Sequence, residues 1–356
     1  MTRIAINGFG RIGRLFFRAA FAKASAGQAG LEVVAINDLG DIENLAYLLK
    51  YDSVYRTYDK DVKFKRDASG VGGELLIGNP SASSGQRKIK VIQEKELAKL
   101  PWKDLKIDIV VEATGAFESF EKSAVHLTAG AKRVVITAPA KDGERDDAKT
   151  VLLGVNEEEF KNCKITSNGS CTTNATHPVA AIMNETVGVA KAILSSTHGY
   201  TATQNAVDGP TKGRDFRRGR AAAVNISPSF TGAAISVTRA VKDLDGKFDG
   251  IALRVPIITG SIADFTFVAK RKTSVEEINN IFKKASQEPR WKGIVKVTED
   301  QIVSSDIIGE SYAAVIDLTY TKVIDGDLVK VLSWYDNEWG YVTTLVSHVI
   351  KVAENL

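Results

Sequence analysis

The stretch RIAINGFGRIG, residues 3–13, decides the fold of the N-terminal half. Residues 3–7 are mostly apolar and typical of a strand, residues 8–13 form a GxGxxG turn, and residues 11–24 carry apolar side chains at helical spacing. In such a turn the first glycine permits the tight bend, the second lets backbone approach a pyrophosphate, and the third permits close helix–strand packing. The N-terminus of the following helix favours a bound anion. The stretch therefore predicts a dinucleotide-binding unit.

A carboxylate follows at the end of the second predicted strand, residues 31–37. Asp38 lies 25 residues after Gly13, slightly beyond the usual spacing of about 20, and the small residues 24–30 form a loop that holds the excess. A carboxylate there accepts hydrogen bonds from both ribose hydroxyls and repels a 2′-phosphate, which favours NAD over NADP. The alternative is an ordinary glycine turn with a surface aspartate.

In the remaining sequence, the pattern of apolar and polar residues changes near residue 169. Before it, the apolar runs 107–113, 132–137 and 151–153 are typical of parallel strands covered on both faces, and the charged, Gly/Ser-rich segment 51–86 predicts an insertion that bears a hairpin. After it, strand candidates alternate polar and apolar residues, as in a mixed, mostly antiparallel sheet. These later strands are expected at 250–255, 262–269, 313–320 and 328–334, with helices at 274–286 and 341–354.

The predicted fold class is α/β, with an N-terminal Rossmann-type parallel sheet and a C-terminal α+β catalytic domain built on the mixed sheet. We expect residues 1–169, completed by the C-terminal helix 337–356, to form the dinucleotide domain and residues 170–336 the catalytic domain. The length of 356 residues suits two domains.

Composition narrows the class of protein. Hydrophobic residues make up 44% and charged residues 25%, which are ordinary globular values, and the net charge of +4 does not favour a nucleic-acid binder. No apolar run approaches the roughly 20 residues that span a bilayer, and we expect no signal peptide before the first strand. Two cysteines make no disulfide framework, which indicates a reducing, cytoplasmic compartment.

A candidate nucleophile lies in SNGSCTTN, residues 167–174. Ser170 is placed to cap a helix that continues through residues 175–184, which leaves Cys171 in its first turn. There the helix dipole and the free N–H groups are expected to lower the thiol pKa. The other cysteine, Cys163, has no such setting and is expected to be a buried, inert thiol, which is also the alternative for Cys171.

A thiolate nucleophile needs a base, and His198 at the end of an apolar strand is the best placed of four histidines. His177, six residues after Cys171, would point away from it on a helix. His126 and His348 are expected to be surface or packing residues. The irregular Cys and His spacing predicts no zinc site, and no carboxylate cluster suggests another metal.

A basic cluster in TKGRDFRRGR, residues 211–220, predicts an anion site. Arginine forks with nearby hydroxyl and N–H donors suit a phosphate-bearing substrate, and Ser229-Phe230-Thr231-Gly232 and Arg254 follow. A solvated basic face is the alternative, while nucleic-acid binding would need an extended basic surface. The basic residues are Lys212, Arg214, Arg217, Arg218 and Arg220.

Together these stretches resemble the phosphorylating glyceraldehyde-3-phosphate dehydrogenase family, over essentially the whole chain. SCTTN and SWYDNEWGY are specific to it, whereas GxGxxG is not. The matching stretches are NGFGRIGR (7–14), EATGA (112–116), APA (138–140), SCTTN (170–174), HGYTATQ (198–204), VDGP (207–210), 217–226, TGAA (231–234), 254–256 and SWYDNEWGY (333–341).

The resemblance implies a role for each matching residue. Cys171 would be the nucleophile and His198 its base, and the segment 200–225 would pack beside a neighbouring subunit's cofactor. The cofactor residues would be Gly8, Gly10, Arg11, Ile12, Gly13, Asp38, Thr114, Thr137 and Asn337. The substrate's phosphate would be held by Arg254, Thr201 and Thr203, and inorganic phosphate by Ser170, Thr172, Thr231, Gly232 and Arg218.

The implied reaction oxidises glyceraldehyde 3-phosphate with NAD and inorganic phosphate to 1,3-bisphosphoglycerate, through a cysteine thiohemiacetal and thioester, in a homotetramer with no membrane and no primary nucleic-acid role. One alternative is a related aldose phosphate such as erythrose 4-phosphate, which TGAA disfavours. Others are oxidation with water in place of phosphate and a dinucleotide-binding or RNA-associated protein without turnover. Two departures from the family are Ala175, where many members have a second cysteine, and Phe230, where a small hydroxyl residue is common.

Overall fold

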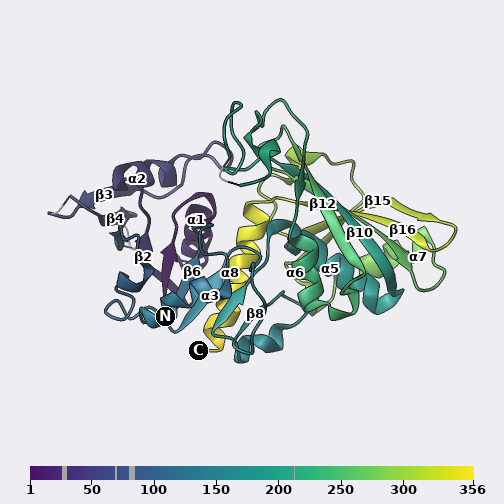
Figure 1. Ribbon diagram of the computed structural model, residues 1–356, viewed down its shortest axis with the longest axis horizontal. Helices are drawn as coiled ribbons and strands as arrows, with labels where there is room; N and C mark the ends of the chain where they lie inside the picture. The colour runs from purple at the N-terminus through teal and green to yellow at the C-terminus, as the bar shows by residue number, and fades with distance from the viewer. Residues whose placement is uncertain (26–29, 69, 80–84, 212) are drawn as a thin grey trace. The chain divides into compact units, whose positions relative to one another are not determined.

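The computed structural model describes residues 1–25, 30–68, 70–79, 85–211 and 213–356. It divides into two compact units (Figure 1). The first consists of Met1–Val151, Glu158–Asn168 and Leu345–Leu356, and the second of Leu152–Glu157 and Gly169–Thr344. The division at 168/169 lies one residue from the predicted boundary, and the C-terminal division falls within helix α8 (Trp339–Glu354) rather than at residue 337.

The first unit is built on a nine-stranded sheet in the order β3-β4-β5-β2-β1-β6-β7-β9-β8. From β5 to β8 every neighbouring pair is parallel, and all four residues of β6 are buried, as expected where both sheet faces are covered. The predicted parallel sheet is therefore confirmed. The strands are β1 Thr2–Asn7, β2 Leu31–Asn37, β3 Val62–Arg66, β4 Gly73–Ile77, β5 Arg87–Ile92, β6 Ile109–Glu112, β7 Arg133–Ile136, β8 Ala148–Thr150 and β9 Ile165–Ser167.

Two details of this sheet bear on the predictions. Strands β3 and β4 form an antiparallel hairpin within residues 51–86, so the predicted hairpin-bearing insertion is confirmed. The strand expected at 151–153 is wrong, because the strand is β8 and residues 151–153 follow it outside the sheet. Those three residues are buried nonetheless, so their apolar character reflects burial and not sheet pairing.

The second unit is built on a seven-stranded sheet in the order β11-β12-β10-β13-β16-β15-β14. Only β10–β12 and β14–β15 pair in parallel, which confirms the mixed, mostly antiparallel sheet. Helices α5, α6 and α7 pack against this sheet. Its strands are β10 Val189–Gly199, β11 Ser227–Phe230, β12 Phe248–Val255, β13 Ser261–Ala269, β14 Val295–Thr298, β15 Ala314–Ile324 and β16 Leu328–Tyr335.

The helices follow the local sequence closely. Ser274 caps α7 by accepting a hydrogen bond from the Glu277 N–H, which matches the predicted start at residue 274. No described helix is long and apolar enough to cross a membrane. The α-helices are α1 Arg11–Ser25, α2 Ile42–Lys50, α3 Phe120–Ser123, α4 Val125–Thr128, α5 Cys171–Thr186, α6 Ala233–Ala240, α7 Val275–Ala285 and α8 Trp339–Glu354.

Candidate active site

The glycine turn after β1 shows why three glycines are needed. At Gly8, where φ is +93°, a Cβ would lie 2.6 Å from the Thr114 nitrogen, and at Gly13 it would collide with the Gly8 carbonyl oxygen. At Gly10, by contrast, a Cβ would meet nothing within 4 Å. The first and third glycines thus permit close backbone packing, whereas the second faces open space where a ligand phosphate can approach.

Beside this turn lies a cavity of about 430 Å³ in the first unit. Its wall includes four of the predicted cofactor residues, Gly8, Gly10, Asp38 and Thr114, together with apolar Leu39, Leu97 and Phe117. A polar rim with apolar walls is the usual character of a nucleotide pocket. The residues present therefore fit a dinucleotide at this place.

Asp38 is held rigidly on the wall of that cavity. Its Oδ2 accepts a hydrogen bond from the Phe9 N–H at 2.6 Å, and its Oδ1 accepts one from the Gly40 N–H at 2.8 Å. The first of these ties the carboxylate to the glycine turn itself. Each oxygen retains acceptor capacity for a ligand hydroxyl.

Other predicted cofactor residues do not line this cavity. Arg11 forms an ion pair with Asp52, and the Thr137 hydroxyl donates to the Glu112 carbonyl oxygen at 3.0 Å. Ile12 and Gly13 lie in the first turn of α1 behind the glycine turn. Asn337 belongs to the second unit, where its Oδ1 accepts from the Ser261 hydroxyl at 2.8 Å and the Gly260 N–H at 3.2 Å.

A buried network behind the cavity was missed by the sequence analysis. The Trp102 indole donates to His126 Nδ1 at 3.0 Å, so His126 Nε2 carries the hydrogen and donates to Glu112 at 3.0 Å. Glu112 also accepts from the Asn7 amide at 2.6 Å and from the Thr114 N–H at 2.9 Å. Because Asn7 and Thr114 line the cavity, the network positions its wall. A charged residue ending the apolar run 107–111 is the signal that could have revealed it.

The histidines expected at the surface or in packing are both buried. His126 belongs to the network just described, so a surface position is wrong for it. His348 Nε2 lies 2.7 Å from the Thr166 hydroxyl, and its ring packs edge-on against Phe160. His177 on α5 lies 3.0 Å from the Leu153 carbonyl oxygen through Nε2 and 3.2 Å from the Thr173 carbonyl oxygen through Nδ1.

Cys171 begins α5, and a reciprocal cap fixes that position. The Ser170 hydroxyl accepts from the Thr173 N–H at 3.0 Å, while the Thr173 hydroxyl accepts from the Ser170 N–H at 3.0 Å. Two N–H groups that a helix N-terminus leaves unpaired are thereby satisfied. The predicted capping by Ser170 is confirmed.

The thiol of Cys171 meets the imidazole of His198. Its Sγ lies 3.3 Å from His198 Nε2, although 27 residues separate the two in the chain. His198 comes from the end of β10 and is 3% exposed. Its ring packs edge-on against Tyr335, whose hydroxyl lies 2.9 Å from that of Thr172 and 2.8 Å from that of Ser196. Tyr335 is a further residue to which the sequence analysis did not assign a role.

Burial sets the proton states of this pair. Burial, and after it the charge of Arg254, lower the pKa of His198 to about 3. Burial raises the pKa of the Cys171 thiol, with Arg254 the largest opposing influence. The lowered thiol pKa expected from the helix N-terminus is therefore wrong, because desolvation acts in the opposite direction. Burial thus acts against the charged form of both groups.

Two arginines approach this pair without a carboxylate partner among the described residues. Arg254 Nη1 lies 2.7 Å from His198 Nδ1, and its Nε is buried without a hydrogen-bond partner in the described ranges. Arg218 donates to the Thr203 hydroxyl at 3.0 Å and to the Ser229 hydroxyl at 2.8 Å. Burial lowers the pKa of Arg254, and the charge of Arg218 adds to this. Such a cationic pair calls for an anion.

Residues that were predicted to form two separate phosphate sites hydrogen-bond to one another in the structure. The Thr203 hydroxyl lies 3.0 Å from that of Thr201 and accepts from Arg218, which the sequence analysis assigned to inorganic phosphate. Thr231 and Gly232 lie at the start of α6, where the Thr231 hydroxyl accepts from the Ala233 N–H at 3.2 Å. Thr172 is buried against Tyr335.

The rest of the basic segment is an exposed surface. Arg217 pairs with Asp215 and Arg220 with Asp208, each at 2.7 Å, while Arg214 is exposed. Lys212 lies outside the described residues. Of the described basic residues in this segment, Arg218 is therefore the one that hydrogen-bonds Thr203 and Ser229.

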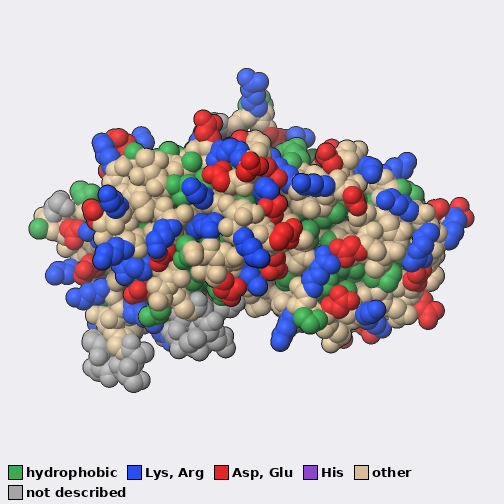
Figure 2. All heavy atoms as spheres, turned by 90° about the horizontal axis from the view of Figure 1, so that it is seen from below, with side chains coloured by type: hydrophobic (Ala, Val, Ile, Leu, Met, Phe, Trp, Pro, Cys, Tyr) green, Lys and Arg blue, Asp and Glu red, His purple; other side chains and the backbone are tan. Residues whose placement is uncertain are grey.

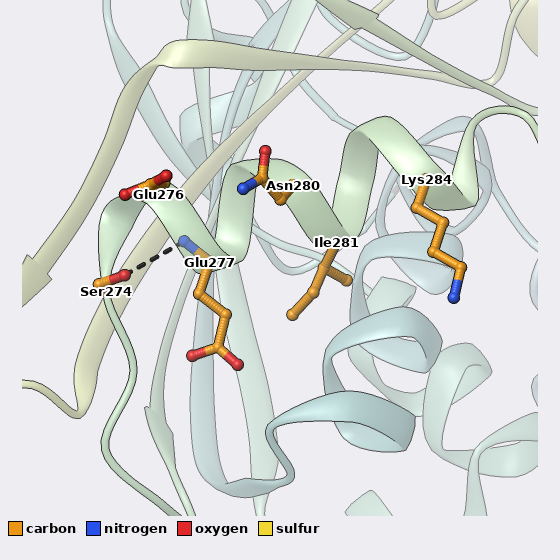
Figure 3. A pocket seen from close by; sticks show the side chains of 6 residues that line it. All are labelled: Ser274, Glu276, Glu277, Asn280, Ile281 and Lys284. Atoms are coloured by element: carbon orange, nitrogen blue, oxygen red, sulfur yellow. Dashed lines mark hydrogen bonds between the residues drawn. The ribbon is translucent and has the colours of Figure 1, made fainter.

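A hollow of about 470 Å³ in the second unit has neither cysteine nor histidine among the residues that line it. Figure 3 shows that its lining side chains come from α7 and from its N-cap Ser274, whose hydroxyl accepts from the Glu277 N–H. The Glu277 carboxylate already accepts from Arg271 and Thr273, each at 2.7 Å. No group of three or more His, Cys, Asp or Glu in the described ranges could hold a metal ion.

A dinucleotide cavity in one unit and, in the other, a thiol–imidazole pair beside two arginines without a carboxylate partner among the described residues define an oxidoreductase of the NAD-dependent, cysteine-bearing class. Comparison with known proteins gives the family. Residues 2–120 match the glyceraldehyde 3-phosphate dehydrogenase NAD binding domain, and residues 170–337 match the C-terminal domain of the same enzyme. The chain belongs to the glyceraldehyde 3-phosphate dehydrogenase family, and its cofactor is NAD.

The similarity to curated relatives extends over the whole chain. A glyceraldehyde-3-phosphate dehydrogenase of Mycobacterium avium is 46% identical over 100% of this chain and 99% of its own length. The enzyme of that name from Clostridium pasteurianum is 44% identical over 97% of each chain, and that of Streptomyces coelicolor 42% identical over 99% of each.

Proposed function

We propose that the protein oxidises glyceraldehyde 3-phosphate with NAD and inorganic phosphate to 1,3-bisphosphoglycerate, in glycolysis or gluconeogenesis. One observation carries the proposal. Cys171 Sγ lies 3.3 Å from the neutral imidazole of His198, beside two arginines, Arg218 and Arg254, that have no carboxylate partner among the described residues. A nucleophile, a base and cationic groups without counter-charge together suit attack on the aldehyde of a phosphate ester.

In the first step that we propose, His198 removes the proton of the Cys171 thiol. Its neutral Nε2 accepts the Cys171 proton as Sγ attacks the aldehyde carbon, and the proton then passes to the carbonyl oxygen to give the thiohemiacetal hydroxyl. The imidazole, again neutral, removes that proton during oxidation, for which NAD supplies the hydride acceptor. A positioned base of this kind contributes about 10²–10⁴-fold to the rate.

The thioester formed on Cys171 retains the energy of the oxidation. Inorganic phosphate attacks its carbonyl carbon, the carbon–sulfur bond breaks, and the acyl phosphate leaves while Cys171 regains its proton. We assign inorganic phosphate to Ser170, Thr172, Thr231, Gly232 and Arg218, and the substrate's phosphate to Thr201, Thr203 and Arg254. The contact between Arg218 and Thr203 suggests that Arg218 serves both phosphates.

For the cofactor we propose the glycine turn Gly8–Gly13, with Asp38 accepting from the ribose hydroxyls and Thr114 on the cavity wall. Thr137 and Asn337 complete the set, Asn337 by orienting the nicotinamide amide. The Asn337 oxygen is already fixed by Ser261 and Gly260, so its amide N–H₂ group is the part presented to a ligand. We further assign residues 1–169 and 337–356 to the NAD-binding domain and 170–336 to the catalytic domain.

A homotetramer is our proposed assembly. The second unit exposes Ile193, Phe230 and Ile251 on neighbouring strands of its sheet, with Phe230 67% exposed. A hollow of about 240 Å³ on the same sheet is lined by Ile193, Val268 and Leu328. Apolar surface of this extent marks an interface, and a further copy of the chain is the occupant that we propose.

We propose a cytoplasmic location and no primary nucleic-acid role. Lys and Arg side chains are interspersed with Asp and Glu over the face shown in Figure 2. Nucleic-acid binding favours an extended basic surface instead, and this mixed charge supports the proposal.

The test is NADH formation from glyceraldehyde 3-phosphate with and without inorganic phosphate, with NAD and NADP in parallel. We expect sustained turnover with NAD only when phosphate is present. Turnover that does not depend on inorganic phosphate would mean that water hydrolyses the thioester. The residues assigned to inorganic phosphate would then not have that role. Erythrose 4-phosphate serves as the competing substrate, and a higher kcat/KM for it would favour that alternative.

A further inference from the structure

Three buried side chains behind the dinucleotide cavity have a fixed direction of hydrogen bonding. An indole N–H can only donate and a carboxylate can only accept, so Trp102 and Glu112 together require one tautomer of His126. Its Nδ1 accepts from the indole at 3.0 Å, and its Nε2–H donates to the carboxylate at 3.0 Å. All three side chains are buried, and none of them is among the described residues that line the cavity.

The carboxylate also sets the side-chain amides that follow it. Because Glu112 accepts from the Asn7 amide at 2.6 Å, the Asn7 oxygen is left to accept from the Asn37 amide at 2.7 Å. The Asn37 side chain in turn bonds both backbone groups of Glu94: its NH₂ group donates to the carbonyl oxygen and its oxygen accepts from the N–H, each at 2.9 Å. A flip of the Asn7 amide would set its oxygen against the carboxylate, so one orientation satisfies the whole chain.

This chain of hydrogen bonds reaches the cavity wall from strands on either side of β1. Glu112 at the end of β6 accepts from the Thr114 N–H at 2.9 Å and from its hydroxyl. Asn37 ends β2, on the other side of β1 in the sheet, and directly precedes Asp38. Asn7, Asn37, Glu94 and Thr114 all line the cavity. Trp102 and His126 therefore act on wall residues that they do not themselves adjoin.

We propose that Trp102 and His126 are positioning residues for NAD, which hold the Glu112 carboxylate and, through it, the orientation of the polar groups in the cavity wall. The inference rests on the proposed function in placing NAD at this cavity. A wall whose donors and acceptors are already oriented needs no reordering when the ligand binds. Loss of the indole N–H leaves a buried acceptor without its donor, so the imidazole is no longer held toward the carboxylate.

A purely structural role would give a different pattern of effects. Trp102 also belongs to an apolar cluster with Leu100 and Ile107. If the cluster alone matters, any substitution that loosens it should weaken NAD binding to the same degree. The two explanations are separated by a substitution that disturbs the cluster and leaves the hydrogen bonds in place.

The experiment measures NAD binding to the full chain by calorimetry, together with the urea midpoint of unfolding. Trp102→Phe keeps an aromatic ring in the cluster and removes the donor. We expect the dissociation constant for NAD to rise about fivefold, which lies in the range of a single hydrogen bond. Ile107→Ala is the matched control, because Ile107 is buried in the same cluster and has no polar side chain. It should lower the urea midpoint at least as far and leave NAD affinity within about twofold.

Two substitutions at His126 test the direction of the hydrogen bonds. A glutamine can accept from the indole through its oxygen and donate to Glu112 through its NH₂ group, whereas a leucine can do neither. We expect His126→Gln to bind NAD within about twofold of the wild type and His126→Leu to bind it about tenfold more weakly. In turnover the loss should appear in KM for NAD and not in kcat, because the thiol belongs to the other unit.

Unchanged NAD affinity in Trp102→Phe and His126→Leu would overturn the proposal, and so would an equal loss of affinity in Ile107→Ala. Equal weakening in His126→Gln and His126→Leu would also reject it, because the shape of the ring would then matter and not its hydrogen bonds. If Trp102→Phe does not fold, the two His126 variants decide.

Calorimetry uses no turnover, so its outcome is separable from that of the proposed function. A protein that shows these affinity changes without oxidising the aldehyde would keep the inference and lose the function. A protein that oxidises the aldehyde while all four variants bind NAD equally well would keep the function and lose the inference.

Discussion

The two reactive regions differ in how their charges are satisfied. At the dinucleotide cavity two carboxylates have their partners within the protein: Asp38 accepts from two backbone N–H groups, and Glu112 accepts from Asn7, Thr114 and His126. At the thiol, Arg254 and Arg218 have no carboxylate partner in the described part of the chain. The first region is complete by itself, whereas the second is completed by an anion.

This difference teaches where the protein is preorganised. Buried polar groups with all their partners form a rigid wall that needs no rearrangement to bind a ligand. Half-buried arginines without a carboxylate partner are destabilising on their own, and they persist where binding an anion offsets that cost. We therefore expect substitutions at the cavity to change cofactor affinity, and substitutions at the thiol to change turnover and anion response.

The largest effect should come from Cys171→Ser. We expect kcat to fall by about 10³-fold or more, because the serine hydroxyl is a far weaker nucleophile at this position. NAD affinity, measured by calorimetry, should stay within about twofold. Cys163→Ala is the matched control and should keep its activity, since Cys163 is 1% exposed and burial raises its pKa to about 11. Wild-type turnover in Cys171→Ser would contradict the proposed mechanism.

The next effect concerns the stability of the folded protein in mild acid. Burial lowers the pKa of His348 from an ordinary 6.5 to about 3, so the unfolded chain binds this proton more readily than the folded one. The contribution of neutral His348 to the free energy of unfolding is fully present above pH 6.5 and is lost as the pH falls toward 3. At pH 5 about 2 kcal/mol of that free energy is lost.

His348→Gln removes that titration. Its free energy of unfolding in urea should fall less between pH 7 and pH 5 than that of the wild type, by about 2 kcal/mol. An equal decrease in both proteins would show that His348 does not contribute. Activity at pH 7 is the control, because His348 contacts Thr166 and Phe160 and neither lies at the thiol.

Local features of both regions could be predicted from the sequence, and long-range ones could not. The glycine turn, the Ser170 cap and the position of Cys171 depend on residues a few positions apart. The Asn7–Glu112 bond joins residues 105 positions apart, and nothing in either segment specifies the other. The thiol pKa was predicted in the wrong direction because its sign depends on burial, which the SCTTN motif does not encode. The pairing of Arg218 with Thr203 likewise depends on how the 200–225 segment folds back.

A smaller effect should follow Glu112→Gln in the buried network. The amide can no longer accept from all of Asn7, Thr114 and His126, so one donor loses its partner at a cost of about 1–3 kcal/mol. Because Asn7 and Thr114 line the cavity, we expect the dissociation constant for NAD to rise about tenfold, with alkylation of Cys171 unchanged. A variant with lower stability but unaltered NAD affinity would mean that the network supports the fold alone.

The most specific change is expected at Asp38, where only the choice between two cofactors should alter. Asp38→Gly removes the carboxylate that would repel a 2′-phosphate, so the ratio of kcat/KM for NAD to that for NADP should fall by about tenfold. Part of this fall would come from loss of the hydrogen bond to the Phe9 N–H, which loosens the glycine turn for both cofactors.

The variant Asp38→Asn separates the two causes, since its amide oxygen can still accept from the Phe9 N–H while the negative charge is gone. If Asp38→Asn loses discrimination as fully as Asp38→Gly, charge repulsion selects NAD; if it keeps discrimination, the hydrogen bonds to the ribose do. If the ratio is unchanged in both variants, Asp38 supports the glycine turn and does not select the cofactor. The cavity would then still have its charges satisfied within the protein, but this would not explain the choice of NAD.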